Sequence, residues 1–205
     1  MVTRRPARWV VGITGASGAV YGVTLCRELI RQGFEVHLVV SDAGWRVLKE
    51  ELGWNAARRE EALHAGLAVP DAAGKWVYHP FGDIGAGIAS GSFRCEGMVV
   101  IPCSMGTLSA IAHGSSDNLL TRAADVTLKE GRPLLLVPRE TPLSAVHLEN
   151  MLKLARIGVR IIPAMPAFYY GPQTLDDAVR FIAGKVLDSM GVEHQLYRRW
   201  GESNE

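Results

Sequence analysis

The chain has 205 residues, of which 48% are hydrophobic and 21% are charged. This is the ordinary mixture of a folded globular protein, and the length fits a single α/β domain over residues 1–205, with short tails at 1–8 and 193–205. The 22 basic and 21 acidic side chains leave a net charge of +1. Because so small a charge attracts neither nucleic acid nor a membrane surface, a charged ligand must be held by local contacts.

The cysteine, apolar and histidine patterns exclude further classes. Cys26, Cys95 and Cys103 are odd in number, lack CxxC spacing and follow no secretory segment, so we expect free thiols and a cytoplasmic protein. The apolar runs at 98–103 and 133–138 are far shorter than the ~18 residues of a membrane-spanning helix. The six histidines show no metal-ligand spacing, so no metal site is expected.

The first half of the chain alternates strand and helix patterns. An apolar, β-branched run that stops at Gly15 predicts a buried strand, and apolar residues at helical spacing follow it up to Gly33. The predicted elements are strands at 9–14 and 35–40 and helices at 19–32 and 42–52. Residues 53–92 are rich in Gly, Ala and Pro with only short periodic pieces, so we expect this stretch to leave the sheet.

The second half returns to regular alternation. The predicted elements are strands at 98–102, 133–137 and 159–163 and helices at 107–112, 118–129, 144–156 and 174–189. Strands that are continuous apolar runs are typical of a parallel sheet with helices on both faces. The sequence therefore predicts a three-layer α/β fold with a central parallel sheet, Rossmann-like or flavodoxin-like. In such sheets, ligands bind beyond the carboxyl ends of the strands.

The loop after the first predicted strand is the first candidate binding site. Gly15-Ala16-Ser17-Gly18 opens a helix, where free backbone N–H groups and the helix dipole favour a phosphate or another anion. A tight turn without a ligand is the alternative, but glycines at 12, 15 and 18 favour a nucleotide site. The spacing is not that of a dinucleotide site. Ser41 also stands where an NAD site places an acid, although Asp42 follows it, so NAD is disfavoured without being excluded.

Three further loops carry candidate ligand contacts. Residues 104–107 are small and hydroxyl-bearing and open a helix, so they either hold a second part of the same ligand or cap the helix. Cys103 beside them reads as a buried structural thiol. Residues 89–92 allow close backbone approach to a ligand or form a plain surface loop. The aromatic loop at 163–170 either walls an apolar pocket or packs in the core.

Basic side chains near the strand ends suit a phosphate ligand. Arg122, Lys129, Arg139 and Glu140 stand within nineteen positions, and the last two directly follow the predicted strand at 133–137. Guanidinium groups fork onto two phosphate oxygens, whereas ammonium acts as a point charge. Each of these residues taken singly also fits a solvated helix face. The charged pair at a strand's carboxyl end favours ligand contact.

Several of these segments together closely resemble the UbiX-type flavin prenyltransferases, also known as the phenylacrylic acid decarboxylase-like family. The segments that carry the resemblance are Gly15-Ala16-Ser17-Gly18, Ala89-Ser90-Gly91-Ser92, Pro102-Cys103-Ser104, Lys129-Glu130 and residues 120–126, 138–143 and 163–169. The resemblance covers nearly the whole chain, roughly residues 9–192. It implies a flavoprotein domain that joins the dimethylallyl group of dimethylallyl phosphate to N5 and then C6 of reduced FMN. It also implies a metal-independent homododecamer whose product, prenylated FMN, is the cofactor of a UbiD-type decarboxylase.

The same resemblance assigns roles to individual residues. The residues expected to hold FMN are Gly15, Ala16, Ser17, Ser41, Ser104, Met105, Gly106 and Thr107, with Arg122 and Arg139 at the junction of FMN and prenyl phosphate. The residues expected around dimethylallyl phosphate, some from a neighbouring subunit, are Ser90, Gly91, Lys129, Glu140, Tyr169 and Lys185, again with Arg122 and Arg139. Two positions depart from the family pattern, because Lys185 replaces a frequent Arg and Ile84 replaces a Trp found in some members.

The expected catalytic residues are Ser17, Glu51, Lys129 and Glu140. Breaking the allylic C–O bond leaves negative charge on the phosphate, which basic side chains stabilise, and positive charge on the prenyl carbon, which aromatic faces stabilise. Ring closure releases the C6 proton, for which Ser17 and Glu51 are the expected relay, although Glu51 also fits an exposed helix position. The sequence leaves two choices open. The donor is either a monophosphate or a diphosphate, and the pathway is either quinone (ubiquinone) synthesis or aromatic-acid breakdown.

Two alternative functions share much of this pattern. One is an FMN-dependent decarboxylase of the peptidyl-cysteine decarboxylase type, which would use an active-site histidine. The other is a non-catalytic flavin-carrier subunit. Lys129 and the Arg139-Glu140 pair favour an anionic phosphate substrate over both alternatives.

Overall fold

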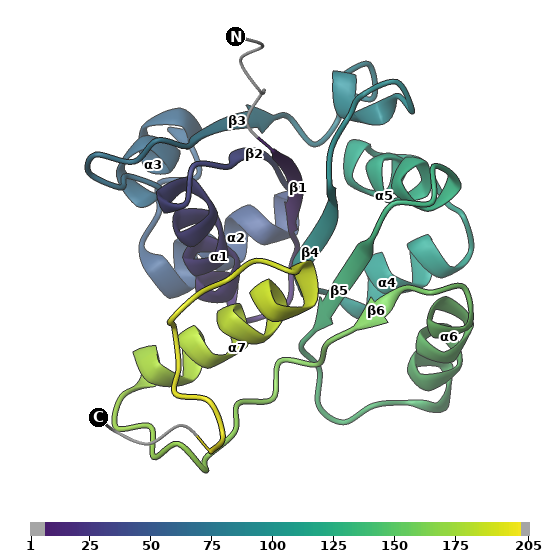
Figure 1. Cartoon of the computed structure of the whole chain (residues 1–205). Helices are drawn as coiled ribbons and strands as arrows, with labels where there is room; N and C mark the ends of the chain where they lie inside the picture. Colours follow the sequence, from purple (N-terminus) through teal and green to yellow (C-terminus); the bar gives the residue numbers. More distant parts are fainter. Residues whose placement is uncertain (1–6, 202–205) are drawn as a thin grey trace, which may run out of the picture.

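The computed structural model describes residues 7–201 and has one central sheet (Figure 1). Its strands are β1 (Arg8–Ile13), β2 (Glu35–Val40), β3 (Lys75–His79), β4 (Gly97–Cys103), β5 (Leu134–Pro138) and β6 (Arg160–Ile161). All neighbouring strands pair in parallel, in the order β3-β2-β1-β4-β5-β6. The predicted parallel α/β fold is confirmed. This order is the Rossmann one, and it reverses direction between β1 and β4, where ligands bind in such folds.

Helices cover both faces of the sheet (Figure 1). They are α1 (Ala19–Arg31), α2 (Asp42–Leu52), α3 (Arg59–Gly66), α4 (Met105–Ala112), α5 (Leu119–Lys129), α6 (Ala145–Arg156) and α7 (Leu175–Met190). Side chains of α1, α2, α3 and α7 form one apolar cluster with one face of the sheet, and α4, α5 and α6 form a second cluster with the other. Alternate residues of β1 and β4 serve the two clusters, which explains why these strands are apolar throughout.

Polar N-cap residues set the helix starts. The side chains of Ser41, Ser104, Asn118, Ser144 and Thr174 each accept a backbone N–H from the first turn of the helix that follows. These bonds satisfy N–H groups that have no partner inside the helix. The six predicted helices therefore begin within two residues of their expected starts, whereas α3 was not predicted.

Residues 53–92 do not leave the sheet, so that expectation is wrong. They contain α3 and the edge strand β3, which pairs with β2 from Glu35↔Lys75 to Val39↔His79. Only a half-buried pattern marks β3, because an edge strand is covered less than a central one. A single turn of 3-10 helix, Gly87–Ala89, then leads toward β4.

Both predicted tails are shorter than expected within the described residues. Arg8 is the first residue of β1, and its guanidinium binds Glu35 at 3.3 Å. At the other end, residues 193–201 fold back on α7, where Tyr197 and His194 both bind the Asp188 carboxylate. The rest of the two predicted tails, residues 1–6 and 202–205, lies outside the described residues. Over residues 7–201, every helix is too short or too polar to cross a bilayer.

Candidate active site

The carboxyl ends of β1, β2, β4 and β5 carry most of the predicted FMN residues to one edge of the sheet. Gly15 follows β1, Ser41 follows β2, Ser104 follows β4 and Arg139 follows β5. In a parallel sheet these ends meet at the same edge. The structure therefore brings together residues that stand up to 124 positions apart in the chain, between Gly15 and Arg139.

The loop after β1 needs glycine for steric reasons. A Cβ on Gly15 would lie 2.5 Å from the Cβ of Ala43, so the start of α2 packs directly against this turn. Gly18 has a φ of 102°, in the left-handed region that favours glycine. The turn is therefore fixed by its neighbours, and Gly15 and Ser17 stay exposed at the sheet edge.

The start of α1 is already occupied by a carboxylate of the same chain. Both carboxylate oxygens of Glu51 accept from the Gly18 N–H at 3.0 Å, and one accepts from the Ala19 N–H at 2.9 Å. Of the N–H groups at this helix start, those of Gly18 and Ala19 therefore bind Glu51 in this structure. The expected Ser17–Glu51 contact is not made among the described residues either, because Glu51 binds backbone N–H groups instead. The N–H groups of residues 15–17 are left to face a ligand.

Removing this carboxylate tests its role as a helix cap. Glu51→Ala is expected to lower the free energy of unfolding by about 0.5–2 kcal/mol, since two N–H groups lose their acceptor and the helix dipole its counter-charge. The midpoint of thermal unfolding should fall by about 2–4 °C per kcal/mol for a chain of this size. Glu51→Gln keeps an acceptor oxygen and should lose less. Calorimetry that finds Glu51→Ala as stable as the parent would rule this role out.

A buried threonine that the sequence reasoning missed joins the ends of β1 and β4. The Thr14 hydroxyl donates to the Pro102 carbonyl at 2.8 Å and accepts the Ser104 N–H at 2.8 Å. Its side chain is only 1% exposed. In the sequence, Thr14 looks like one more β-branched strand residue. The available signal was its position, as the last polar residue of an apolar strand directly before the glycine loop.

Ser41 and Ser104 act as helix caps, and Ser41 and Thr107 still have O–H groups to offer. Ser41 Oγ accepts the Gly44 N–H at 3.0 Å, which leaves its own O–H available as a donor. Ser104 Oγ accepts the Thr107 N–H at 3.3 Å and donates to Thr107 Oγ1 at 3.1 Å, so the Thr107 O–H is the free donor there. The capping alternative is thus confirmed and is compatible with a ligand. A Cβ on Gly106 would meet nothing within 4 Å, so this loop is open to a ligand.

Cys103 is structural, as predicted. Its side chain is fully buried, and burial raises the pKa of the thiol far above its ordinary value. A protonated thiol in an apolar setting is a poor nucleophile.

Arg139 and Glu140 lie at the same edge as the glycine loop. Arg139 Nε donates to the Ser17 carbonyl at 3.2 Å, which ties the end of β5 to the loop after β1. Glu140 accepts the Thr141 N–H at 3.0 Å. Burial raises the pKa of the nearby Tyr21, opposed by the positive charge of Arg139 and helped by Glu51. Tyr21 is a second residue near this edge that the sequence reasoning missed.

Three other predicted residues lie at the opposite edge of the sheet. Ser90 and Gly91 precede β4, and Lys129 ends α5 just before β5. A Cβ on Gly91 would fall 2.9 Å from Lys129 Nζ, so these two residues are neighbours. The seven residues of β4 separate them from Ser104, about 23 Å at the usual rise of a strand. A single chain therefore does not bring Lys129 to Arg139.

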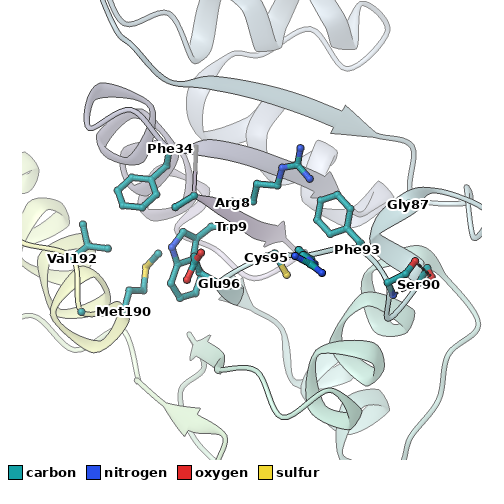
Figure 2. Close-up of a pocket in the computed structure, with 14 residues that line it drawn as sticks. Arg8, Trp9, Phe34, Gly87, Ser90, Phe93, Cys95, Glu96, Met190 and Val192 are labelled. Atoms are coloured by element: carbon teal, nitrogen blue, oxygen red, sulfur yellow. Dashed lines mark hydrogen bonds between the residues drawn. The ribbon is translucent and has the colours of Figure 1, made fainter. Parts of the chain in front are cut away.

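A groove of about 1150 Å³ opens at that amino-terminal edge (Figure 2). Its walls come from the start of β1, the loop before β4 and the end of α7, and they include Arg8, Ser90, Phe93 and Val192. Arg132 holds the loop before β4 in place, because its guanidinium donates to the Gly91 and Phe93 carbonyls at 2.8 and 2.7 Å. The loop thus presents Ser90 and Gly91 from a defined position.

The remaining predicted residues lie apart from both edges or on outer faces. Tyr169 packs its ring against Phe181 of α7 and Trp200, with centroids 6.2 and 5.1 Å apart. Lys185 pairs with Asp188 at 3.8 Å. Arg122 pairs with Asp125 at 3.0 Å on the half-exposed side of α5. Ile84 is 62% exposed.

Three of the four predicted cations of the prenyl-phosphate site have a carboxylate neighbour, and the fourth, Arg139, binds the Ser17 carbonyl instead. Besides the pairs of Lys185 and Arg122, Lys129 binds Glu130 at 2.6 Å. Such exposed pairs are worth little, so a phosphate can replace the carboxylate at low cost. Over residues 7–201, no group of His, Cys, Asp and Glu side chains is arranged to hold a metal ion.

The chain is similar to known flavoproteins along nearly its whole length. A model of the Flavoprotein family matches residues 2–187. The flavin prenyltransferase UbiX of Alkalihalophilus pseudofirmus is 57% identical over 192 residues, which cover 94% of this chain and 95% of that protein. The solved structure of AnUbiX (PadA1) in complex with FMN and dimethylallyl pyrophosphate has a TM-score of 0.87 and 40% identity, covering 98% of this chain and 100% of that one. A dodecameric FMN-dependent UbiX-like decarboxylase from Escherichia coli O157:H7 has a TM-score of 0.84 and 47% identity, covering 95% and 100%.

These matches define the class of the protein as a flavoprotein with a Rossmann-like sheet. Within that class, the chain belongs to the UbiX flavin prenyltransferase family, as its sequence motifs predicted.

Proposed function

We propose that this chain is a flavin prenyltransferase that joins the dimethylallyl group of dimethylallyl phosphate to N5 and C6 of reduced FMN. The observation that carries the proposal is the edge where Ser41, Thr107 and Arg139 meet the exposed glycine loop. Relatives and a solved complex with FMN and dimethylallyl pyrophosphate support the same activity.

The carboxyl edge has the features that FMN requires. Gly15, Ala16 and Gly106 let a ring approach the backbone closely, since Gly106 has open space where a Cβ would stand. The O–H groups of Ser41 and Thr107 are donors for phosphate or ring oxygens. Arg139 adds the positive charge that a phosphate needs, and Met105 supports the loop from within the core. Bound there, FMN supplies the nucleophilic N5 and C6 positions.

We propose that a neighbouring subunit supplies the prenyl-phosphate residues of the amino-terminal edge. Ser90, Gly91 and Lys129 would reach the carboxyl edge of the next chain, because one chain holds the two edges a strand length apart. Arg122, Tyr169 and Lys185 are proposed to join them. A dodecameric relative with 47% identity supports such an assembly. The family's homododecamer is our proposal for this chain as well.

The basic side chains have a defined task in this reaction. As the allylic C–O bond breaks, its electron pair goes to the phosphate oxygen, and Lys129 and Arg139 stabilise that charge. Glu140 is proposed to orient these cations. We keep Ser17 and Glu51 as the proposed pair that takes up the C6 proton, which requires Glu51 to turn from the Gly18 N–H to the Ser17 hydroxyl.

The wider setting is also part of the proposal. The product, prenylated FMN, would pass to a UbiD-type decarboxylase. A cytoplasmic location is supported by the three free cysteines at 26, 95 and 103.

Incubation with reduced FMN and dimethylallyl phosphate tests the activity directly. Mass spectrometry of the extracted flavin should show the gain of one prenyl unit, C5H8, because phosphate leaves and a proton is lost. A parallel reaction with dimethylallyl pyrophosphate identifies the preferred donor. Unchanged FMN with both donors would contradict the proposal and favour a flavin carrier, and decarboxylation of a peptide ending in cysteine would favour the decarboxylase alternative.

A further inference from the structure

A row of buried titratable side chains crosses β2 and β3, and the proposed reaction does not use it. His37 Nε2 lies 3.1 Å from Glu35 Oε1, and His37 Nδ1 lies 2.9 Å from His79 Nε2. The side chains of Glu35 and His37 are each only 7% exposed. The row therefore forms one continuous chain of hydrogen bonds, Glu35–His37–His79.

Donor and acceptor chemistry fixes the direction of these bonds. An ionised carboxylate only accepts, so His37 Nε2 must carry a proton and donate to Glu35. Neutral His37 then accepts at Nδ1, and His79 Nε2–H must be the donor to it. Both histidines therefore carry a proton on Nε2, and His37 has none on Nδ1.

The surrounding charges agree with this arrangement. Burial lowers the pKa of His37 to about 4, helped by His79 and opposed by Glu35. Burial also lowers the pKa of His79, opposed by Asp83. Burial raises the pKa of Glu35, but Arg8 at 3.3 Å and Lys75 at 3.7 Å outweigh it and keep the carboxyl ionised.

Phe93 connects this row to the groove of Figure 2. Its ring meets His37 edge-on, with centroids 4.7 Å apart, and the Arg8 guanidinium lies 5.3 Å from the ring centre. Figure 2 shows Phe93 between Arg8 and the segment that carries Ser90. The Phe93 N–H donates to the Ser90 carbonyl at 3.1 Å, so Phe93 and Ser90 belong to the same turn. Arg132 holds the other side of this turn.

We infer that His37 and His79 are positioning residues, whose hydrogen-bonded pair supports the turn at 90–93 and releases it when His37 takes up a proton. Protonated His37 carries N–H groups at both ring nitrogens, so its Nδ1–H would face the Nε2–H of His79. One bond of the row must then break or His79 must change tautomer. The new charge would also be repelled by the cationic Arg8, which already helps to lower the pKa of His37. The consequence for Ser90 and Gly91 as substrate residues rests on the proposed function.

Hydrogen exchange on the purified protein tests the support itself, without any substrate. We expect backbone exchange at 90–93, corrected for intrinsic rate, to rise at least fivefold between pH 7 and pH 4, where His37 takes up its proton. The side chain of His79→Gln can offer its N–H to neutral His37 Nδ1 and its oxygen to a protonated Nδ1–H, so protection in this variant should stay constant over this range. His113→Gln changes an exposed histidine and should behave like the parent. Equal pH dependence in the parent and in His79→Gln would overturn the inference.

Two further measurements keep the test independent of folding and of activity. Nitrogen-15 spectra at pH 7 should show both His37 and His79 protonated on Nε2, and any other tautomer pair would refute the bond directions. Phe93→Leu removes the ring contact and should leave 90–93 exchanging fast at both pH values. If the protein prenylates FMN, KM for dimethylallyl phosphate should rise at pH 4 in the parent but not in His79→Gln, while FMN affinity is unchanged. Failure of prenylation with the exchange pattern intact would count against the proposed function alone.

Discussion

Oligomers that contain both Lys129→Ala and Arg139→Ala chains are expected to prenylate FMN, although neither variant does so alone. Each substitution removes a cation from the departing phosphate and should cost about 10²–10³-fold in kcat, the usual loss when one preorganised stabilising group is deleted. Because Lys129 and Arg139 lie at opposite edges of one chain, a site built from two chains has one intact edge from each variant. With random mixing, about one quarter of such sites would be intact.

The measurement is the rate of prenylated FMN formation by co-expressed variants, isolated as one oligomer through two different affinity tags. Mixing the two purified oligomers without exchange of subunits is the control, and it should stay inactive. A chain that carries both substitutions, co-expressed with the parent, is the positive control, because about one quarter of its two-chain sites would also be intact. If the co-expressed variants stay as inactive as each variant alone, the two edges of a site do not come from different chains. The two-chain site would then be wrong.

Thr14→Val is expected to have the second-largest effect, on stability and on FMN binding together. The substitution keeps the shape but removes the only hydroxyl that joins the Pro102 carbonyl to the Ser104 N–H. A buried donor or acceptor left without a partner costs about 1–3 kcal/mol. The thermal midpoint should fall by about 2–4 °C per kcal/mol. Since Ser104 caps α4, whose first turn carries Thr107, FMN affinity should also fall.

Thr14→Ser is the matched control, because it keeps the hydroxyl and loses one methyl group. It should retain FMN affinity close to that of the parent, while Thr14→Val loses it. Calorimetry and fluorescence titration with FMN provide the two readings. An unchanged FMN affinity in Thr14→Val would show that FMN binding at the start of α4 does not depend on the bond between the Thr14 hydroxyl and the Ser104 N–H.

The central elements were predictable because their signals are local. The run from Trp9 to Ile13 is apolar throughout, and this alone indicates a strand covered on both sides. The helix α2 has its cap at Ser41 and a left-handed glycine at Gly53, and both signals stand in the sequence. The edge strand β3 was missed because its five residues are only partly buried and give no clear period. Its place is decided by pairing with β2.

The proposed binding residues also divide into those that local sequence signals predicted and those that they did not. Glycines and hydroxyls after β1 and β4 identified the carboxyl edge, since a parallel sheet requires these loops to be neighbours. The occupation of the α1 start by Glu51 was not predictable, because Glu51 is 32 positions away from Ala19 and looks like any exposed helix residue. The role of Thr14 was not predictable either, because Thr14 looks like one more β-branched residue of the strand predicted at 9–14.

The sequence by itself determined the parallel α/β class, the family and the types of residue that we propose meet the ligand. These follow from periodicity, caps and short motifs, each of which acts over a few neighbouring residues. Only the tertiary structure decided that Arg139 and Lys129, ten positions apart, lie at opposite edges of the sheet. The extended strand β5 lies between them, so Lys129 precedes its amino end and Arg139 follows its carboxyl end.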